Sequence, residues 1–171
     1  NPPYIDVDNP VGTYRRTFTV PRNWQEREVF LHFGSISGYA RIYVNGQQVG
    51  MTKASKTPAE FNVTNYLKEG ENLLAVQIYR WHDGSYMEDQ DFWRLTGIER
   101  DVFLQAYPKL TIWDFFLKSS LDSTYKNGIF NATVDLREFT GNNVKKGTLK
   151  LELLDKTGKI VLSQQKKFDI E

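Results

Sequence analysis

Apolar and polar side chains alternate with a period of two along most of this chain, and this pattern limits the fold more than any other feature. Successive side chains of a β-strand point to opposite faces, so alternation predicts strands with one buried face. Aromatic residues make up 14% of the chain and pack well on a pleated, half-buried surface. A helical repeat is nearly absent. The sequence therefore predicts an all-β protein.

The first part of the chain predicts an antiparallel sandwich. Strands are expected at residues 14–20, 29–33, 40–44, 73–81 and 101–106, with a short return strand from Gln48. Asn45-Gly46 predicts a type I′ hairpin because both residues accept positive φ. Residues 59–68 are expected to hold one helical turn at most. About seven strands without crossover helices favour a two-sheet sandwich such as a jelly roll.

The alternation restarts after Pro108. Strands are expected at residues 110–118, 129–136, 148–154 and 159–168, with a tight turn at 155–158. Four strands do not complete a sandwich of about seven. We therefore expect a first domain at 1–108 and, at 109–171, the first part of an immunoglobulin-like domain whose Leu149, Leu151 and Leu153 are incompletely covered. A chain that starts at Asn1 also indicates a piece of a longer protein.

Composition argues against several classes of partner. The formal net charge of +1 lacks the basic footprint of a nucleic-acid-binding protein, and no apolar run approaches the roughly 18 residues of a membrane span. Without cysteine there is no disulfide, thiolate nucleophile or cysteine-based zinc site. The compartment stays open, because cytoplasm and bacterial periplasm fit equally.

One long connection, residues 81–97, combines four carboxylates with four aromatic rings. Carboxylates accept hydrogen bonds from sugar hydroxyls, and rings cover the apolar face of a pyranose. Asp91 could also ligate a hard cation. Two plainer readings remain: a solvated acidic loop, and aromatic rings that close the end of the sandwich. Arg94 either orients a carboxylate or ties the loop to the sheet, and His82 is expected to be an exposed spectator.

No catalytic set is predicted within the chain. Two histidines, His32 and His82, do not suggest a Ser/His/Asp arrangement. Neighbouring carboxylates in a solvated loop do not give one acid the raised pKa that glycoside hydrolysis needs. A catalytic carboxylate pair is expected elsewhere.

Four stretches of the chain resemble a known protein family. R-W-H-D-G-S-Y-M-E-D-Q-D-F-W-R-L-T-G-I-E-R-D-V-F-L at 80–104 is similar to the loop and strand near the end of the sugar-binding domain of family 2 β-galactosidases. N-P-V-G-T-Y-R-R-T-F-T-V at 9–20, Y-V-N-G-Q-Q-V-G at 43–50 and S-K-T-P-A-E-F-N-V at 55–63 follow the family's order. The resemblance implies a jelly-roll, galactose-binding-like sandwich followed by an immunoglobulin-like domain.

The resemblance also implies a role for each part. The parent enzyme would hydrolyse terminal β-D-galactosides with retention, through two glutamates of a (β/α)8 barrel that lie outside this chain. Asp91 matches a residue that ligates sodium and approaches the galactose. Glu88, Asp89, Trp93 and Arg94 are expected to support the loop, with Glu88 and Asp89 contacting water or backbone. Magnesium is expected in the parent's catalytic domain and not on this part.

Expected partners are therefore the β-galactoside, the barrel domain and further copies of the parent in a homo-oligomer. Lys53 and Asp83 match a peripheral divalent-cation site of some members, but the lysine would repel such an ion. Two alternatives remain: a free-standing carbohydrate-binding module, and part of a β-glucuronidase or β-mannosidase of the same family. The motif E-D-Q-D-x-W-R at 88–94 is closer to the β-galactosidase pattern.

Overall fold

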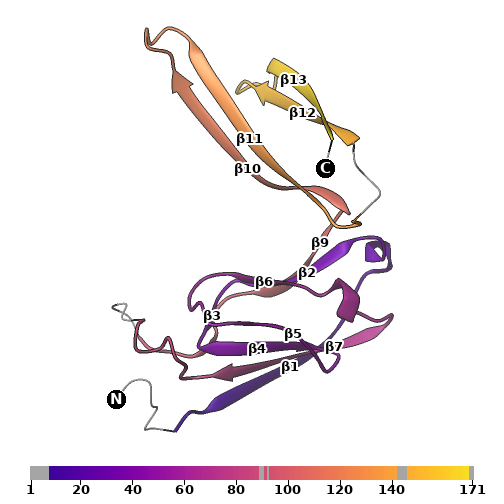
Figure 1. Ribbon diagram of the computed structural model, residues 1–171, viewed down its shortest axis with the longest axis vertical. Helices are drawn as coiled ribbons and strands as arrows, with labels where there is room; N and C mark the ends of the chain where they lie inside the picture. The colour runs from indigo at the N-terminus through magenta and orange to yellow at the C-terminus, as the bar shows by residue number, and fades with distance from the viewer. Residues whose placement is uncertain (1–7, 89–90, 92, 142–145, 170–171) are drawn as a thin grey trace. The chain divides into compact units, whose positions relative to one another are not determined.

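The computed structural model describes residues 8–88, 91, 93–141 and 146–169, and they form an antiparallel all-β chain, as predicted. Within these described residues, thirteen strands and two 3-10 turns follow one another (Figure 1). They are β1 (Val11–Thr19), η1 (Arg22–Trp24), β2 (Glu28–Phe33), β3 (Ile36–Ser37), β4 (Tyr39–Val44), β5 (Gln47–Thr52), β6 (Ala59–Asn62), η2 (Thr64–Tyr66), β7 (Glu71–Tyr79), β8 (Gly97–Ile98), β9 (Val102–Tyr107), β10 (Leu110–Leu121), β11 (Gly128–Glu138), β12 (Lys146–Leu154) and β13 (Ile160–Asp169).

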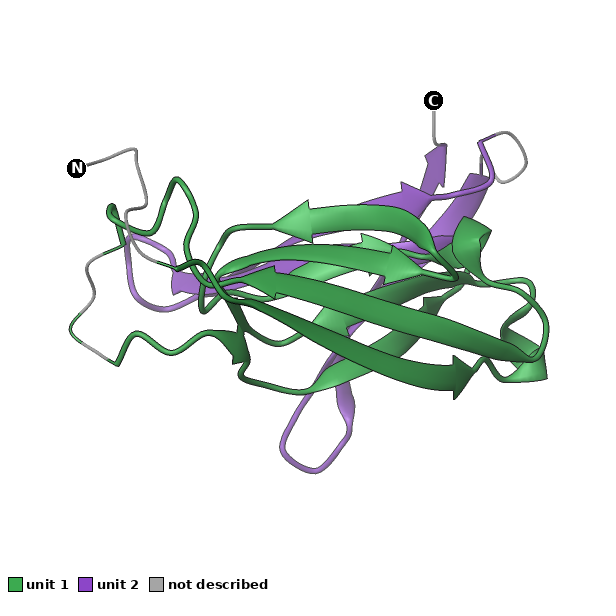
Figure 2. Cartoon of the chain, turned by 90° about the horizontal axis from the view of Figure 1, so that it is seen from below, with its two compact units in different colours: residues 1–108 green, residues 109–171 purple. Residues whose placement is uncertain are grey.

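The chain divides into two compact units, residues 1–108 and 109–171 (Figure 2). The first unit is a sandwich of two main sheets, with strand orders β1-β7-β4-β5 and β6-β2-β9. The two sheets lie one above the other in Figure 1. A two-residue ladder between β3 and β8 pairs Ile36 with Ile98 and Ser37 with Gly97. This ladder is too short to leave an alternating pattern in the sequence, and it was not predicted.

The core of the first unit lies between the two main sheets. Its members are buried apolar side chains from the inward faces of β2, β4 and β7, joined by one residue of β3 and one directly after β6: Val29, Leu31, Phe33, Ile36, Ala40, Ile42, Val44, Val63, Val76 and Ile78. Arg41 and Tyr43 lie on the opposite face of β4, as the alternation predicts. The hairpin after β4 also forms as expected, with φ of 51° at Asn45 and 83° at Gly46.

Two features of the first unit go beyond what the sequence predicted. Residues 59–68 hold one helical turn as expected, the 3-10 turn Thr64–Tyr66, but they begin with strand β6, which pairs with β2 and was not predicted. The alternation in residues 101–106 predicts that Val102 points inward, and its pairing with the buried Phe33 places it on that face, although it is 37% exposed. Strands β1 and β9 are the outer strands of their sheets, and an apolar cleft of about 520 Å³ lined by residues of both opens there.

The second unit consists of two hairpins, β10–β11 and β12–β13, each a two-stranded sheet. Asp155 and Gly158 form the predicted tight turn between β12 and β13, where Gly158 has a φ of 85°. Leu149 and Leu151 are half-buried and Leu153 is 39% exposed, so none of the three is fully covered. No helix in the described part of the chain is long and apolar enough to cross a membrane.

Candidate functional site

The candidate site is the connection between β7 and β8, residues 80–96, and its first end is fixed to the start of the chain. Asn9 Nδ2 donates to the carbonyl oxygen of Trp81 at 2.9 Å, and Asn9 Oδ1 accepts from the Trp81 amide at 2.9 Å. The Arg80 amide donates to the carbonyl oxygen of Pro10 at 3.2 Å. These bonds satisfy backbone groups just beyond the last residue of β7, so the loop begins from a fixed point.

A compact turn follows at residues 82–88. The Ser85 amide donates to the carbonyl oxygen of His82 at 3.0 Å, and Ser85 Oγ accepts from the His82 amide at 3.0 Å. His82 Nδ1 accepts from the Gly84 amide at 3.2 Å. The His82 side chain is only 6% exposed, so the prediction of an exposed spectator is wrong. This histidine organises the turn because a ring nitrogen can accept a backbone N–H.

Lys53 holds the same turn from outside. Its Nζ lies 2.9 Å from Oδ1 and 2.8 Å from Oδ2 of Asp83, and this hydrogen bond lowers the pKa of the Asp83 carboxyl. Both side chains are well exposed, at 43% and 67%, so solvent screens the pair and its contribution to stability is small. The ammonium group occupies both carboxylate oxygens that a divalent cation would use.

The far end of the loop is fixed by Glu99, which follows β8. Ser35 Oγ donates to Glu99 Oε2 and Ser37 Oγ to Oε1, each at 3.0 Å, and Lys56 Nζ contacts Oε1. Partial burial acts to raise the pKa of Glu99, but the bonds from Lys56, Ser37 and Ser35 outweigh it and lower the pKa below its usual range. The carboxylate is therefore held in its charged form.

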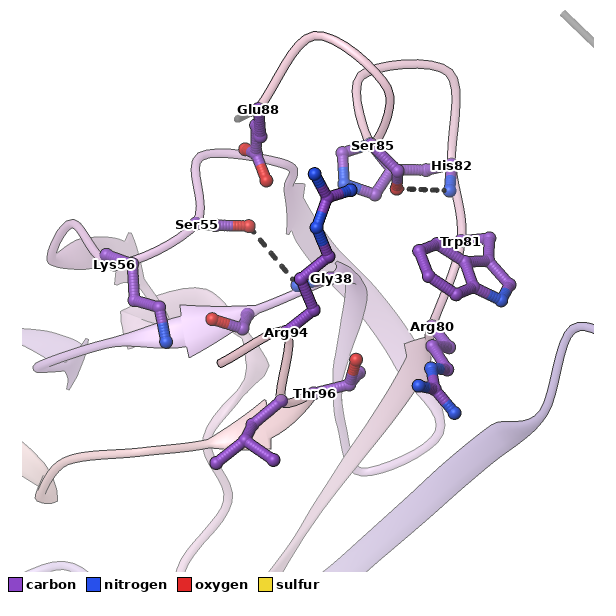
Figure 3. A pocket seen from close by; sticks show the side chains of 12 residues that line it. Gly38, Ser55, Lys56, Arg80, Trp81, His82, Ser85, Glu88, Arg94 and Thr96 are labelled. Atoms are coloured by element: carbon purple, nitrogen blue, oxygen red, sulfur yellow. Dashed lines mark hydrogen bonds between the residues drawn. The ribbon is translucent and has the colours of Figure 1, made fainter. Parts of the chain in front are cut away.

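A small polar cavity lies beneath the loop (Figure 3). Its lining includes Glu88 and Arg94 from the loop, and Ser37, Ser55 and Lys56 from the facing segments. The Glu88 carboxylate and the Arg94 guanidinium are directed into the same space in Figure 3. The cavity volume is about 50 Å³, which is room for a few water molecules and not for a pyranose ring.

The structure separates the predicted site residues into two groups. Glu88 and Arg94 come together at the cavity, on the inner side of the loop. Asp91 and Trp93 lie on the exposed part, where the Trp93 side chain is 85% exposed. Asp89 lies outside the described residues.

Sequence reasoning missed the residues that fix the loop from other segments, namely Asn9, Ser35, Ser37, Lys56 and Glu99. One signal was available: Ser35 and Ser37 are small polar residues on either side of Ile36, in a stretch where apolar side chains dominate. A buried hydroxyl requires a hydrogen-bond partner, so such a pair indicates a polar contact. The identity of that partner, more than 60 positions away, requires the fold.

Among the described residues no three histidine or acidic side chains lie close enough together to hold a metal ion. Asp91 offers one exposed carboxylate. A carboxylate oxygen is the kind of ligand that a hard cation prefers. Asp91 alone would supply one such ligand.

Comparisons with known proteins agree on the family. The model for the sugar binding domain of glycosyl hydrolases family 2 matches residues 1–108. The chain is 41% identical over 162 residues to the β-galactosidase of Priestia megaterium, covering 94% of the chain and 16% of the relative. It is 39% identical over 164 residues to the Vibrio cholerae β-galactosidase, covering 96% of the chain and again 16% of the relative. The chain thus spans about a sixth of the length of these curated relatives.

Solved structures show the same fold. A β-glucuronidase of an uncultured Clostridium species matches with a TM-score of 0.72 and 28% identity, over 93% of this chain and 29% of that one. A Bacteroides uniformis β-glucuronidase matches with a TM-score of 0.79 and 24% identity, over 97% of this chain and 20% of that one, and at this identity the likeness concerns the fold alone. With the family model over residues 1–108, these likenesses establish that the chain belongs to glycosyl hydrolase family 2 and carries that family's sugar-binding domain.

Proposed function

We propose that residues 80–97 form one wall of a galactoside- and sodium-binding site in a β-galactosidase whose catalytic glutamates lie outside this chain. The observation that carries the proposal is a loop fixed at both ends that leaves Asp91 and Trp93 exposed. Identity of about 40% to proteins named β-galactosidase supports the galactoside. Residues 109–171 are proposed to be the first part of an immunoglobulin-like domain.

The exposed residues supply the two contacts that a sugar requires. The Asp91 carboxylate accepts hydrogen bonds from hydroxyl groups, and the Trp93 ring covers an apolar C–H face. On the inner side, Glu88 and Arg94 line a cavity too small for the sugar, so they support the loop from behind. The wall thus contributes binding contacts and no proton transfer.

A sodium ion would be held by Asp91 together with ligands from outside the chain. When bound, it would neutralise the carboxylate and offer open coordination positions to sugar hydroxyls. Binding energy from such a remote wall helps to hold the reacting centre in its productive geometry. The role of this chain is to keep Asp91 in the position that binds the ion and the sugar. Magnesium is proposed for the parent's catalytic domain only, and the parent is proposed to be a homo-oligomer.

The absence of catalysis in the isolated chain can be tested directly. We expect no hydrolysis of a chromogenic β-galactoside by residues 1–171, and hydrolysis by the full-length gene product that carries them. The reason is that exposed carboxylates in one loop do not form an acid and a nucleophile on opposite sides of a glycosidic bond. Turnover by residues 1–171 alone would overturn the noncatalytic role.

Asp91 can be tested in the full-length protein. In Asp91→Asn we expect kcat/KM for the galactoside to fall by about 10- to 100-fold, the value of a hydrogen bond to a charged group, and the sodium response to weaken. Asp101→Asn, a change of another exposed aspartate of the first unit, is the matched control and is expected to retain wild-type kinetics. An Asp91→Asn enzyme with unchanged kinetics and sodium response would remove Asp91 from the site.

A β-glucuronidase is the second candidate, because the solved structures that match carry that name. Assaying the full-length protein with matched chromogenic galactoside and glucuronide separates the two. We expect kcat/KM to be greater for the galactoside, since the curated β-galactosidases share about 40% identity with the chain. A greater kcat/KM for the glucuronide would mean that the wall binds a glucuronide and not a galactoside.

A further inference from the structure

Glu99 joins three segments that are far apart in the sequence. Its carboxylate accepts from Ser35 and Ser37, which flank Ile36, and contacts the ammonium of Lys56 in the connection between β5 and β6. Its amide donates to the carbonyl oxygen of Ser35 at 3.1 Å. Glu99 directly follows β8, and β8 directly follows the loop at residues 80–96. The contacts of Glu99 with Ser35, Ser37 and Lys56 therefore fix the end of the loop.

Burial makes this contact stronger than the ion pair at the other end of the loop. Ser35 and Ser37 are 1% and 4% exposed, and the Glu99 and Lys56 side chains are 23% and 34% exposed. The Lys53 and Asp83 side chains are more exposed, at 43% and 67%. Solvent weakens an exposed pair, whereas breaking a partly buried one leaves charged and hydroxyl groups without partners.

The connection that carries Lys56 is itself held in an unusual conformation. Lys56 has a φ of 67°, which a residue with a side chain adopts at a cost. Its amide donates to the carbonyl oxygen of Ile36 at 3.4 Å, and Ser55 Oγ accepts from the Gly38 amide at 3.3 Å. The cavity that Glu88 and Arg94 line is also lined by Ser37, Ser55 and Lys56 (Figure 3). The connection between β5 and β6 and the loop therefore face the same cavity.

We propose that Glu99 is a positioning residue for the sugar wall. By binding Lys56, Ser35 and Ser37 together, it restricts residues 80–96 to the conformation that presents Asp91. Glu99 touches neither sugar nor ion in this role. The inference rests on the proposed function, because Asp91 must be the contact that the loop presents.

The experiment compares Glu99→Gln and Lys56→Met with wild type in the full-length protein. Hydrogen exchange of amides 80–96 is expected to be about tenfold faster in both variants, because loss of one charge-assisted hydrogen bond shifts a local opening equilibrium by roughly that factor. Glu60→Gln is the matched control, since Glu60 pairs with His32 on β2 and lies outside this contact. It is expected to leave exchange in the loop unchanged.

Kinetics in sodium then separate positioning from direct contact. Suppose that in Glu99→Gln the loop holds Asp91 in its ion-binding position for about a tenth of the time. The sodium concentration for half-maximal activity then rises about tenfold, and saturating sodium restores kcat/KM. Asp91→Asn is not restored, because the charged carboxylate that would bind the ion is gone. Potassium at equal ionic strength controls for screening. Melting curves of all variants check that each is folded.

The positioning role of Glu99 and the binding role of Asp91 can fail separately. Wild-type exchange rates in both folded Glu99→Gln and folded Lys56→Met would overturn the inference whatever Asp91→Asn does. Faster exchange together with an unchanged sodium requirement in an enzyme that does depend on Asp91 would overturn it as well. Unchanged kinetics in Asp91→Asn would instead overturn the proposed function, and the exchange data would still decide whether Glu99 fixes the loop.

Discussion

At the scale of single residues, Asp122 shows how one carboxylate closes a hairpin. Asn127 Nδ2 donates to its Oδ2 at 2.6 Å, and Thr124 Oγ1 and the amides of Thr124, Lys126 and Asn127 donate to Oδ1. These bonds, those from Asn127 and Thr124 first, lower the pKa of Asp122 from 3.8 to about 2. The turn between β10 and β11 therefore depends on a charged carboxylate.

The pH dependence of this turn has a definite sign. Because the folded pKa lies below the unfolded one, the stabilising contribution is complete above about pH 4 and is lost as the pH falls through about 2. We expect an NMR titration of the side-chain carboxyl carbons to give a midpoint near 2 for Asp122. The midpoint of Asp122 in Asn127→Ala should move toward the ordinary value for aspartate. A midpoint near 4 in wild type would contradict the hydrogen-bonded turn.

At the scale of elements, the step from β3 to β4 depends on a glycine. Gly38 has a φ of 100°, and a Cβ placed there would lie 2.6 Å from the carbonyl oxygen of Tyr79 and 3.0 Å from Thr96 Cγ2. The backbone of β7 therefore passes too close for any side chain. Gly70 also has a positive φ, of 82°, but a Cβ there would meet nothing within 4 Å.

This difference predicts unequal costs for the same substitution. Gly70→Ala should lower the free energy of unfolding by about 1 to 2 kcal/mol, the cost of the left-handed conformation. Gly38→Ala adds a clash with backbone and should cost about 3 kcal/mol or more. Urea denaturation of both variants measures the difference. Equal losses would mean that β7 can move away from Gly38 at little cost.

The sequence predicted the elements where a local rule decides the outcome. Alternation identified the long strands, and Asn45-Gly46 identified its hairpin, because side-chain burial and positive φ are properties of neighbouring residues. Strand β6 was missed because it has only four residues, too few for their alternation to stand out in the sequence. Its place was decided by pairing with β2, which is a tertiary contact.

The same division applies to the site. The composition of the loop indicated sugar recognition, which stays a prediction, and the structure shows that Asp91 is exposed. The contacts that fix the loop were not predictable, because Asn9 and Trp81 are 72 positions apart and Ser35 and Glu99 are 64 positions apart. His82 was misread since burial of a polar ring depends on its surroundings and not on its type.

At the scale of the whole chain, the two units differ in how they bury apolar surface. Every fully buried apolar side chain among the described residues lies between Val29 and Ile78, within the first unit. In the second unit Phe115, Phe116 and Tyr125 are 61%, 67% and 79% exposed. Apolar burial is the main driving force for folding, so the first unit holds most of the stability of the chain.

Residues 1–108 are therefore expected to fold without residues 109–171. Because every buried apolar side chain among the described residues belongs to the first unit, deleting 109–171 should leave its calorimetric transition within about 3 °C, the shift that less than 1 kcal/mol produces. Residues 109–171 alone should show no cooperative transition, since two separate hairpins without a buried core are marginal in water. A sharp transition in the isolated second unit, or a large loss of melting temperature in 1–108, would mean that the two units depend on each other for stability.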